Sequence, residues 1–333
     1  MTKLIAETAW HHEGDYYFMK DLVSQLCEMS STDVIKMHIT LDFDEYMSKE
    51  HDAYNILKKW LLSAEQWEEL IDKVRLNGKE LMLLLNDTSA IKFAAQYNSE
   101  LVELHSVCLN VPSLQQAILE EIDSKTKIII GVGGCSLQEI DKAVEAFKKR
   151  DTILMFGFQN YPTRYADVNL NKIRKVQSLY PDNRYGYADH TAWDEENNEF
   201  ITMLVSANSM DYIEKHVTTE YGKERCDYSA AISIDMFESL AKKVRLLDSI
   251  AGDGVIALNE GEKEYSKYGL MKMAAVAVNN LNKGKVVTID DIRFCRTSET
   301  TDLSQIDVLN YLSHPLQQDI KTGAPFKRSH FSE

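Results

Sequence analysis

The sequence has few cysteines and no apolar segment long enough to cross a membrane. Its five cysteines are odd in number and none forms a C-x-x-C pair, so a disulfide framework is not indicated and a reducing compartment is. The first ten residues, MTKLIAETAW, lack the apolar core of a signal peptide. No apolar run approaches the ~20 residues of a transmembrane helix. We therefore expect a cytoplasmic protein with no membrane association.

Positive charge is also scarce. Lysine and arginine number 37 against 52 aspartate and glutamate residues, which gives a formal net charge of −15. This excess of negative charge argues against binding to nucleic acid or to an anionic membrane surface. The hydrophobic fraction of 44% in 333 residues is enough for a sizeable core. We expect a globular chain with one large domain and one small domain.

Short apolar runs alternate with amphipathic helical stretches over the first 250 residues. The expected strands cover residues 3–8, 33–39, 79–85, 101–109, 127–134, 152–158, 184–190 and 212–218, and the expected helices cover 16–30, 63–78, 88–98, 113–123, 136–150, 170–181, 196–210 and 233–250. Two of these helices begin with capping boxes, at Ser63–Gln66 and Ser136–Glu139, and Gly78 is expected to end the first of the two. Eight strand–helix units of this length favour an α/β fold with a (β/α)₈ TIM barrel. No G-x-G-x-x-G follows the first strand, which weakens the dinucleotide-binding alternative.

The pattern changes after about residue 250. We expect the barrel to span residues 1–252 and a linker rich in glycine and charge to span 253–270. Residues 271–333 contain short strands, short helices and turns, which predicts a small separate domain.

Two histidines end the seventh and eighth expected strands. His190 follows Asp189, and His216 lies two residues after Glu214. The active site of a TIM barrel lies at the C-terminal ends of its strands, so these two imidazoles should be neighbours there. With carboxylates nearby they form a candidate site for Mn, Fe or Zn. The alternative is that each is a hydrogen-bonded structural histidine.

The first two strands also end on charged residues. Lys36 is either a Schiff-base nucleophile, an anion ligand, or a solvated lysine at the start of a loop. Glu7 is either an acid or base, or an ion-pair partner for Lys36, and we favour the ion pair.

Several motifs, in order along nearly the whole chain, resemble the sialic acid (N-acetylneuraminate) synthase family. IAETAWHHEGD is similar to its IAEIGxNHxGD opening, and YPTRYADVNL to its YPTPxEDVNL segment. YGYADHT and IEKHVT are similar to GYSDHT and IEKHFT. AVNNLNKGKVVTIDDIRFCR resembles the antifreeze-like (SAF, β-clip) domain that ends these proteins.

The resemblance implies an enzyme, a transferase of sialic acid biosynthesis. Family members condense phosphoenolpyruvate with the open-chain aldehyde of an N-acylated hexosamine, with a divalent metal such as Mn, Mg or Co, to give a nonulosonic acid. It implies that His190 and His216 bind the metal and that Lys36 meets the donor. It further implies that an arginine of the antifreeze-like domain, Arg296, binds the acceptor's N-acyl group in the barrel of a partner subunit, in a domain-swapped homodimer. The remaining catalytic and substrate-binding positions that it implies are Glu7, His38, Ser106, Cys108, Gln159, Tyr161, Asp189, Glu214 and Asp227.

The fourth expected strand departs most from the family. The family pattern K-I-G/A-S-G/x-E/D reads here as Glu103-Leu104-His105-Ser106-Val107-Cys108, so the phosphate-binding lysine is Glu103 and the catalytic carboxylate is Cys108. Two family serines near the donor are Gly131 and Ala188. Either the donor has changed, or Glu103 pairs internally and other groups hold the phosphate.

Three hypotheses remain open. The first is the metal-dependent, phosphoenolpyruvate-using synthase of the family. The second is a relative that uses a non-phosphorylated 2-oxo acid, or runs as a lyase, in which Cys108 acts as an acid. The third is a non-catalytic protein that binds sugar acids.

Overall fold

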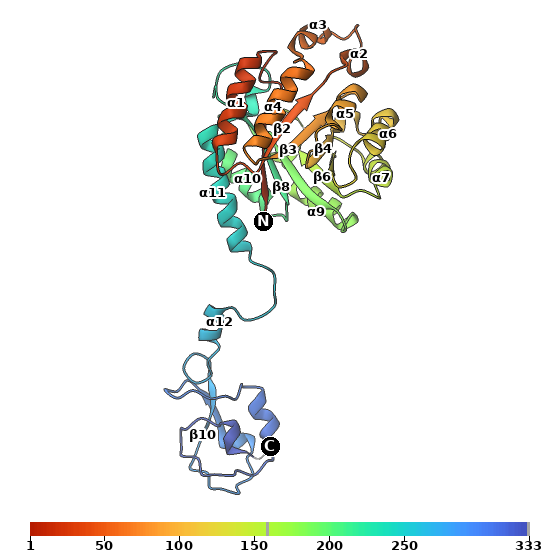
Figure 1. The fold of residues 1–333 in the computed structure, drawn as a ribbon. Helices are drawn as coiled ribbons and strands as arrows, with labels where there is room; N and C mark the ends of the chain where they lie inside the picture. The colour runs from red at the N-terminus through yellow and green to blue at the C-terminus, as the bar shows by residue number, and fades with distance from the viewer. Residues whose placement is uncertain (158–159, 332–333) are drawn as a thin grey trace. The chain divides into compact units, whose positions relative to one another are not determined.

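The computed structural model describes residues 1–157 and 160–331, which form two compact units, Met1–Gly252 and Asp253–Glu333. Figure 1 shows the helices and strands of both units. In the first, eight parallel strands follow one another around a closed barrel, in which β1 pairs with both β2 and β8. The strands are β1 (Lys3–Glu7), β2 (Val34–Ile39), β3 (Glu80–Leu85), β4 (Leu101–Leu104), β5 (Lys127–Gly131), β6 (Thr152–Gly157), β7 (Arg184–Asp189) and β8 (Tyr212–Thr218). The predicted TIM barrel is confirmed.

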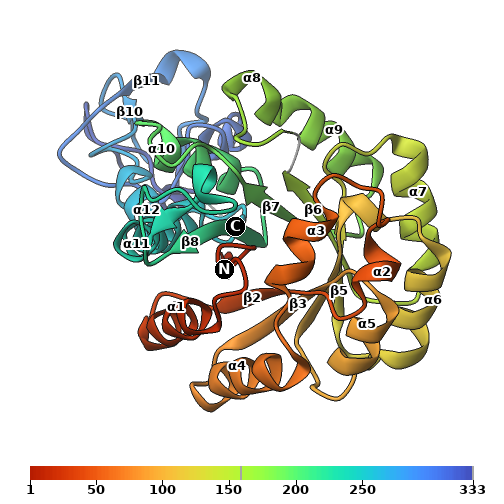
Figure 2. The ribbon, with the colours of Figure 1, turned by 90° about the horizontal axis from the view of Figure 1, so that it is seen from above.

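Helices cover the outside of the barrel (Figure 2). They are α1 (Tyr16–Glu28), α4 (Ala64–Leu76), α5 (Thr88–Ala94), α6 (Pro112–Glu121), α7 (Leu137–Ala146), α9 (Leu170–Leu179), α10 (Asn198–Ser206) and α11 (Ile234–Ala251). Both predicted capping boxes form, at the starts of α4 and α7, and Gly78 follows α4 with φ +69°. The sequence pattern did not predict the short helices α2 (Phe43–Tyr46), α3 (Tyr54–Leu57) and α8 (Tyr165–Val168), nor the two-residue strand β9 (Ile232–Ser233).

A buried apolar layer fills the interior of the barrel and receives a side chain from every strand. Its members are Ile5, Val34, Met82, Leu101, Ile129, Ile153, Met155, Ala188 and Tyr212. Side chains alternate between the two faces of a strand, so the residue two positions further along also points inward. On four strands that residue is Glu7, Lys36, Glu103 or Glu214. The alternation therefore builds a polar layer on the apolar one, toward the C-terminal ends of the strands.

The fourth strand is shorter than predicted. It ends at Leu104, and residues Ser106–Cys108 form a 3₁₀ turn. The backbone N–H of Val107 donates to the ring of His105 at 3.3 Å, which caps that turn. The expected strand over 101–109 is wrong in its second half because the His105 side chain bonds the backbone locally.

The second unit has its own buried apolar cluster, which includes Ala275, Val287, Phe326 and Phe331. Its sheet consists of two antiparallel strands, β10 (Ala274–Ala277) and β11 (Ile292–Cys295). The stretch expected to be an irregular linker contains helix α12 (Glu260–Tyr265), which begins with a capping box between Asn259 and Glu262. The antifreeze-like identity of this unit stays a prediction. Over the residues that the structure covers, no helix is long and apolar enough to cross a membrane.

Candidate active site

A pocket of about 190 Å³ lies at the C-terminal ends of the strands, and all eight barrel strands contribute to its lining. Glu7, Lys36, Glu103 and Glu214 lie deep in it, where the polar layer meets the apolar one. The position is the one that TIM-barrel enzymes use for catalysis.

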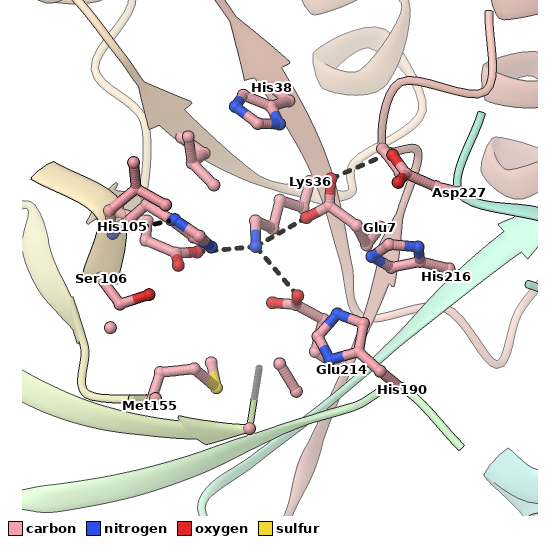
Figure 3. Close-up of a pocket in the computed structure, with 18 of the residues that line it drawn as sticks. Glu7, Lys36, His38, His105, Ser106, Met155, His190, Glu214, His216 and Asp227 are labelled. Atoms are coloured by element: carbon pink, nitrogen blue, oxygen red, sulfur yellow. Dashed lines mark hydrogen bonds and ion pairs between the residues drawn. The ribbon is translucent and has the colours of Figure 1, made fainter. Parts of the chain in front are cut away.

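Lys36 lies at the centre of three buried carboxylates (Figure 3). Its Nζ is 2.7 Å from Glu7 Oε2, 2.7 Å from Glu103 Oε2 and 2.9 Å from Glu214 Oε1. The lysine side chain is 4% exposed and none of the glutamates exceeds 3%. At an effective dielectric constant of ~20, each contact of this length is worth about 6 kcal/mol before desolvation offsets it. The predicted Glu7–Lys36 ion pair is confirmed, and Glu103 pairs internally with the same lysine. We call these four side chains the Lys36 cluster.

The charges of the Lys36 cluster perturb one another. Burial opposes the charge on Lys36, but Glu103, Glu214 and Glu7 outweigh it and hold the lysine pKa well above its ordinary value. Burial raises the pKa of Glu214 to about 8, and burial also raises the pKa of Glu7, although Lys36 opposes both shifts. Lys36 therefore stays an ammonium ion at neutral pH. A Schiff-base role is not supported, because that chemistry needs a neutral amine.

The pocket as a whole is poor in positive charge. Among the lining residues that the structure describes, the formally charged side chains are Lys36 and the four carboxylates of Glu7, Glu103, Glu214 and Asp227. With all of them ionised, the sum is 1 − 4 = −3. An anionic ligand would therefore compete with the three glutamates for Lys36.

His190 and His216 lie side by side, as predicted from the ends of neighbouring strands. Their rings are 4.8 Å apart between centroids and nearly perpendicular, at 86°. Burial lowers the pKa of His190 to about 3 and holds the pKa of His216 well below its ordinary value. Both imidazoles are neutral near pH 7, which is the form that binds metals.

A third histidine, His11, packs against His216 with a centroid separation of 5.7 Å. Its Nδ1 lies 2.7 Å from the carbonyl oxygen of Cys226, and its Nε2 is buried with no hydrogen-bond partner among the residues that the structure describes. A Nδ1–H bonded to a carbonyl leaves the lone pair on Nε2. Neutral imidazoles beside an acidic pocket are a donor set that fits a divalent cation. Within residues 1–157 and 160–331, however, no group of three or more His, Cys, Asp or Glu side chains is arranged to hold a metal ion.

Asp189 lies outside the pocket. It precedes His190 on an extended backbone, so the two side chains point to opposite faces. Its carboxylate is 3.2 Å from Nζ of Lys215, which precedes His216, and both side chains are 0% exposed. Nζ of Lys215 also donates to Asn198 Oδ1 at 2.8 Å. The catalytic role predicted for Asp189 is not supported by this position. We interpret the ion pair as one that positions the ends of β7 and β8, and with them the two histidines.

The 3₁₀ turn after β4 separates Ser106 from Cys108. Ser106 lines the pocket, whereas Cys108 belongs to the hydrophobic core outside the barrel strands. Its Sγ lies 3.5 Å from the carbonyl oxygen of His105, and burial raises its pKa to about 12. An acid role for Cys108 is not supported, because the turn aims the thiol away from the pocket.

The glycine at position 131 is required by a close contact. A Cβ atom there would lie 2.8 Å from the backbone nitrogen of Ser106. Backbone from the β4 turn therefore occupies the space that a side chain at position 131 would need. Ala188 also lines the pocket, and its methyl side chain offers no hydrogen-bonding group.

Four further residues of the barrel were predicted to bind substrate, and three of them lie at the pocket. His38, Tyr161 and Asp227 line the pocket. Asn86 Nδ2 lies 2.6 Å from His38 Nε2, and the hydroxyl of Tyr161 donates to the backbone carbonyl of Asp227. Gln159 lies outside the described residues.

Arg296 belongs to the second unit. It is exposed there, and its Nε donates to the carbonyl oxygen of Leu270 at 2.8 Å. Its predicted place in a partner's barrel stays a prediction.

Sequence reasoning did not single out several groups that the fold brings to the site. Trp10 and Tyr46 line the pocket, and His11 contacts the metal-candidate histidine His216. His105, from the polar group on the fourth expected strand, lines the pocket as well. The run of Trp10, His11 and His12 directly after the first strand was a usable signal. Tyr46 was not predictable, since it comes from a short helix outside the strand–helix repeat.

Comparison with known proteins agrees with this architecture. The family model of the NeuB family matches residues 28–256. Human N-acetylneuraminate-9-phosphate synthase is 23% identical over 301 residues, covering 86% of this chain and 81% of that protein. An uncharacterized protein of Methanocaldococcus jannaschii is 26% identical over 321 residues, covering 92% of this chain and 88% of that one.

A solved structure is similar in fold. The N-acetylneuraminic acid (sialic acid) synthetase of Leptospira borgpetersenii superposes with a TM-score of 0.71 at 22% identity. The match covers 79% of this chain and 89% of that one. At this level of identity the likeness concerns the fold alone.

Proposed function

Because the chain belongs to the NeuB family, we propose that it is a sialic-acid-type synthase that forms a carbon–carbon bond between a three-carbon acid and a sugar aldehyde. The acceptor is an N-acylated hexose and the product is a nonulosonic acid. A divalent metal, held by His190 and His216, is the proposed cofactor, and a homodimer that exchanges Arg296 is the proposed assembly. The observation that carries the proposal is the pairing of two neutral imidazoles with an ammonium group in one pocket at the end of the barrel.

The residues of the chain divide the work between two sides of the pocket. His190 and His216 would hold the metal, which supplies Lewis-acid polarisation of the acceptor's carbonyl when bound. The Lys36 ammonium would neutralise negative charge on the three-carbon acid. Half-buried aromatic side chains of the lining, among them Tyr161 and Trp10, would exclude water from the forming bond. The ion pair between Asp189 and Lys215, which lies outside the pocket, would hold the ends of β7 and β8 so that the two histidines stay side by side.

Phosphoenolpyruvate is the first donor to test, since it is the donor that the resemblance of the sequence to sialic acid synthases implies. In that reaction C3 of the donor bonds to the aldehyde carbon, water adds at C2, and phosphate leaves. We expect phosphate release with Mn and one of a panel of N-acyl hexosamines. His190→Ala should abolish it, and His51→Ala, at an exposed histidine of the same unit, should not. No product with any donor and acceptor, together with no bound metal by elemental analysis, would favour the non-catalytic hypothesis.

A specific observation favours a second donor. Glu103 binds Lys36 at 2.7 Å, where a phosphate would need an unengaged cation. A non-phosphorylated 2-oxo acid has only its carboxylate charge to be neutralised, so it needs less positive charge than phosphoenolpyruvate does. Product formation from pyruvate without phosphate release distinguishes this donor from the first.

A further inference from the structure

The two donors need different chemical groups in the pocket. Phosphoenolpyruvate already contains the enol, so its C3 needs no base, but its phosphate carries about −1.5 to −2 charges that need cations. A 2-oxo acid has no phosphate, but its C3 becomes a nucleophile only after a base removes a proton. A pocket specialised for phosphoenolpyruvate should therefore be rich in cations, and a pocket specialised for a 2-oxo acid should be rich in carboxylates.

The pocket has the composition that suits a 2-oxo acid. Of its described lining residues only Lys36 is a lysine or arginine, and three glutamates already engage that side chain. Where β4 and β5 meet, a Cβ at position 131 would lie 2.8 Å from the backbone nitrogen of Ser106, so this part of the wall cannot carry a serine hydroxyl toward a phosphate. Three glutamates, by contrast, lie within one layer around Lys36.

We propose that the donor is an enolisable 2-oxo acid without a phosphate group, and that Glu103 is the base that removes its C3 proton. This inference rests on the proposed function, because it names the donor class of that same site. Glu103 lies on β4, which is opposite β8 in a closed barrel of eight strands. It therefore approaches a ligand from the side opposite His216 and Glu214.

The three carboxylates are not equivalent. Glu7 Oε1 accepts the backbone N–H of Ala9 at 2.9 Å, which fixes that side chain. Glu214 shares β8 with His216, on the side assigned to the acceptor. Glu103 has neither of these features, and like the other two glutamates it makes an ionic contact with Lys36. By elimination, Glu103 is the carboxylate assigned to the donor side of the pocket.

The proposed step balances without a co-reactant. The C3–H bond breaks and its proton passes to Glu103, while the electron pair moves through C2 to the oxo oxygen, forming an enolate beside the Lys36 ammonium. C3 then bonds to the aldehyde carbon, and the aldehyde oxygen takes up one proton. One proton leaves carbon and one is added to oxygen, so no water is consumed and no phosphate is released.

Deuterium exchange tests this step without any acceptor. The full chain is incubated with Mn and pyruvate in D₂O, and the deuterium content of the methyl group is measured by mass spectrometry. We expect exchange well above the buffer rate, a loss of ~10²–10⁴-fold in Glu103→Gln, and no change in Glu121→Gln, at an exposed position at the end of α6. Glu103→Asp keeps a carboxylate and should retain measurable exchange, which separates loss of the base from loss of folding.

The outcomes separate this inference from the proposed function. Phosphate release from phosphoenolpyruvate, with no exchange into pyruvate, overturns the inference and supports the proposed function. Exchange without product from any N-acyl hexose supports the inference and counts against the proposed acceptor. Undiminished exchange in a folded Glu103→Gln variant overturns the assignment of the base.

Discussion

Replacing Glu214 by glutamine should change how the stability of the barrel depends on pH. The variant keeps the shape of the side chain and removes its titration. In the folded protein, burial raises the pKa of Glu214 from 4.5 to about 8. Between these values the folded state holds a proton that the unfolded state has lost, so the free energy of unfolding falls as the pH rises. Below pH 4.5 both states are protonated, and the contribution to stability is fully present.

The magnitude follows from the size of the shift. One proton gives a slope of about 1.4 kcal/mol per pH unit. Between pH 5 and pH 8 the titration removes about 3 to 4 kcal/mol from the wild-type chain, and Glu214→Gln does not suffer this loss. The variant should therefore gain stability relative to the wild type by this amount as the pH rises across the window.

Guanidinium unfolding followed by far-UV circular dichroism, in EDTA at pH 5, 6, 7 and 8, measures the difference. Glu121→Gln, at an exposed site, controls for the loss of one carboxylate, and its difference from the wild type should be constant with pH. A difference between Glu214→Gln and the wild type that varies by less than about 1 kcal/mol would refute the reasoning. It would mean that Lys36 keeps Glu214 ionised at neutral pH despite burial.

Three further predictions concern the surroundings of the Lys36 cluster. Replacing His190 or His216 by alanine should weaken Mn binding by at least ~100-fold in isothermal titration calorimetry, because each removes one of two imidazoles. Lys215→Met should destabilise the barrel by about 3–5 kcal/mol by leaving Asp189 charged and buried; adding Asp189→Leu should recover much of that loss in denaturant unfolding. Gly131→Ser should lower the melting temperature and should not create phosphate binding, since its Cβ would meet loop backbone at 2.8 Å; unchanged melting with a gain of phosphate affinity in calorimetry would contradict this.

The barrel was predictable because each local signal agreed with the global fold. The capping boxes at Ser63 and Ser136, and eight apolar runs of similar spacing, all indicate strand–helix units. The main error lies where a short-range bond replaces regular structure, since His105 ends β4 early by capping a 3₁₀ turn. The predicted linker over residues 253–270 contains the short helix α12, which Asn259 caps.

The part of the site that lies at the ends of the barrel strands could be predicted from the sequence. Lys36, Glu7, Glu214 and the two histidines were identified from their positions alone, and the fold brings them into one pocket. The position of Asp189 does not support its predicted catalytic role, and alternation along the strand indicated this, since neighbouring side chains of a strand face opposite sides. The contact between Glu103 and Lys36 was not predictable in geometry, because it forms across the barrel between strands that do not pair with each other.

Position 103 sets the charge of the whole Lys36 cluster. With glutamate there and all four groups ionised, three carboxylates and one ammonium sum to 1 − 3 = −2. A lysine there would leave two ammonium groups against Glu7 and Glu214, and the sum would be 2 − 2 = 0. A third buried carboxylate is tolerable only beside a cation, so the 2.7 Å contact to Lys36 is what lets glutamate occupy this layer. The same contact withdraws that cation from an incoming phosphate, so glutamate at position 103 disfavours a phosphorylated donor.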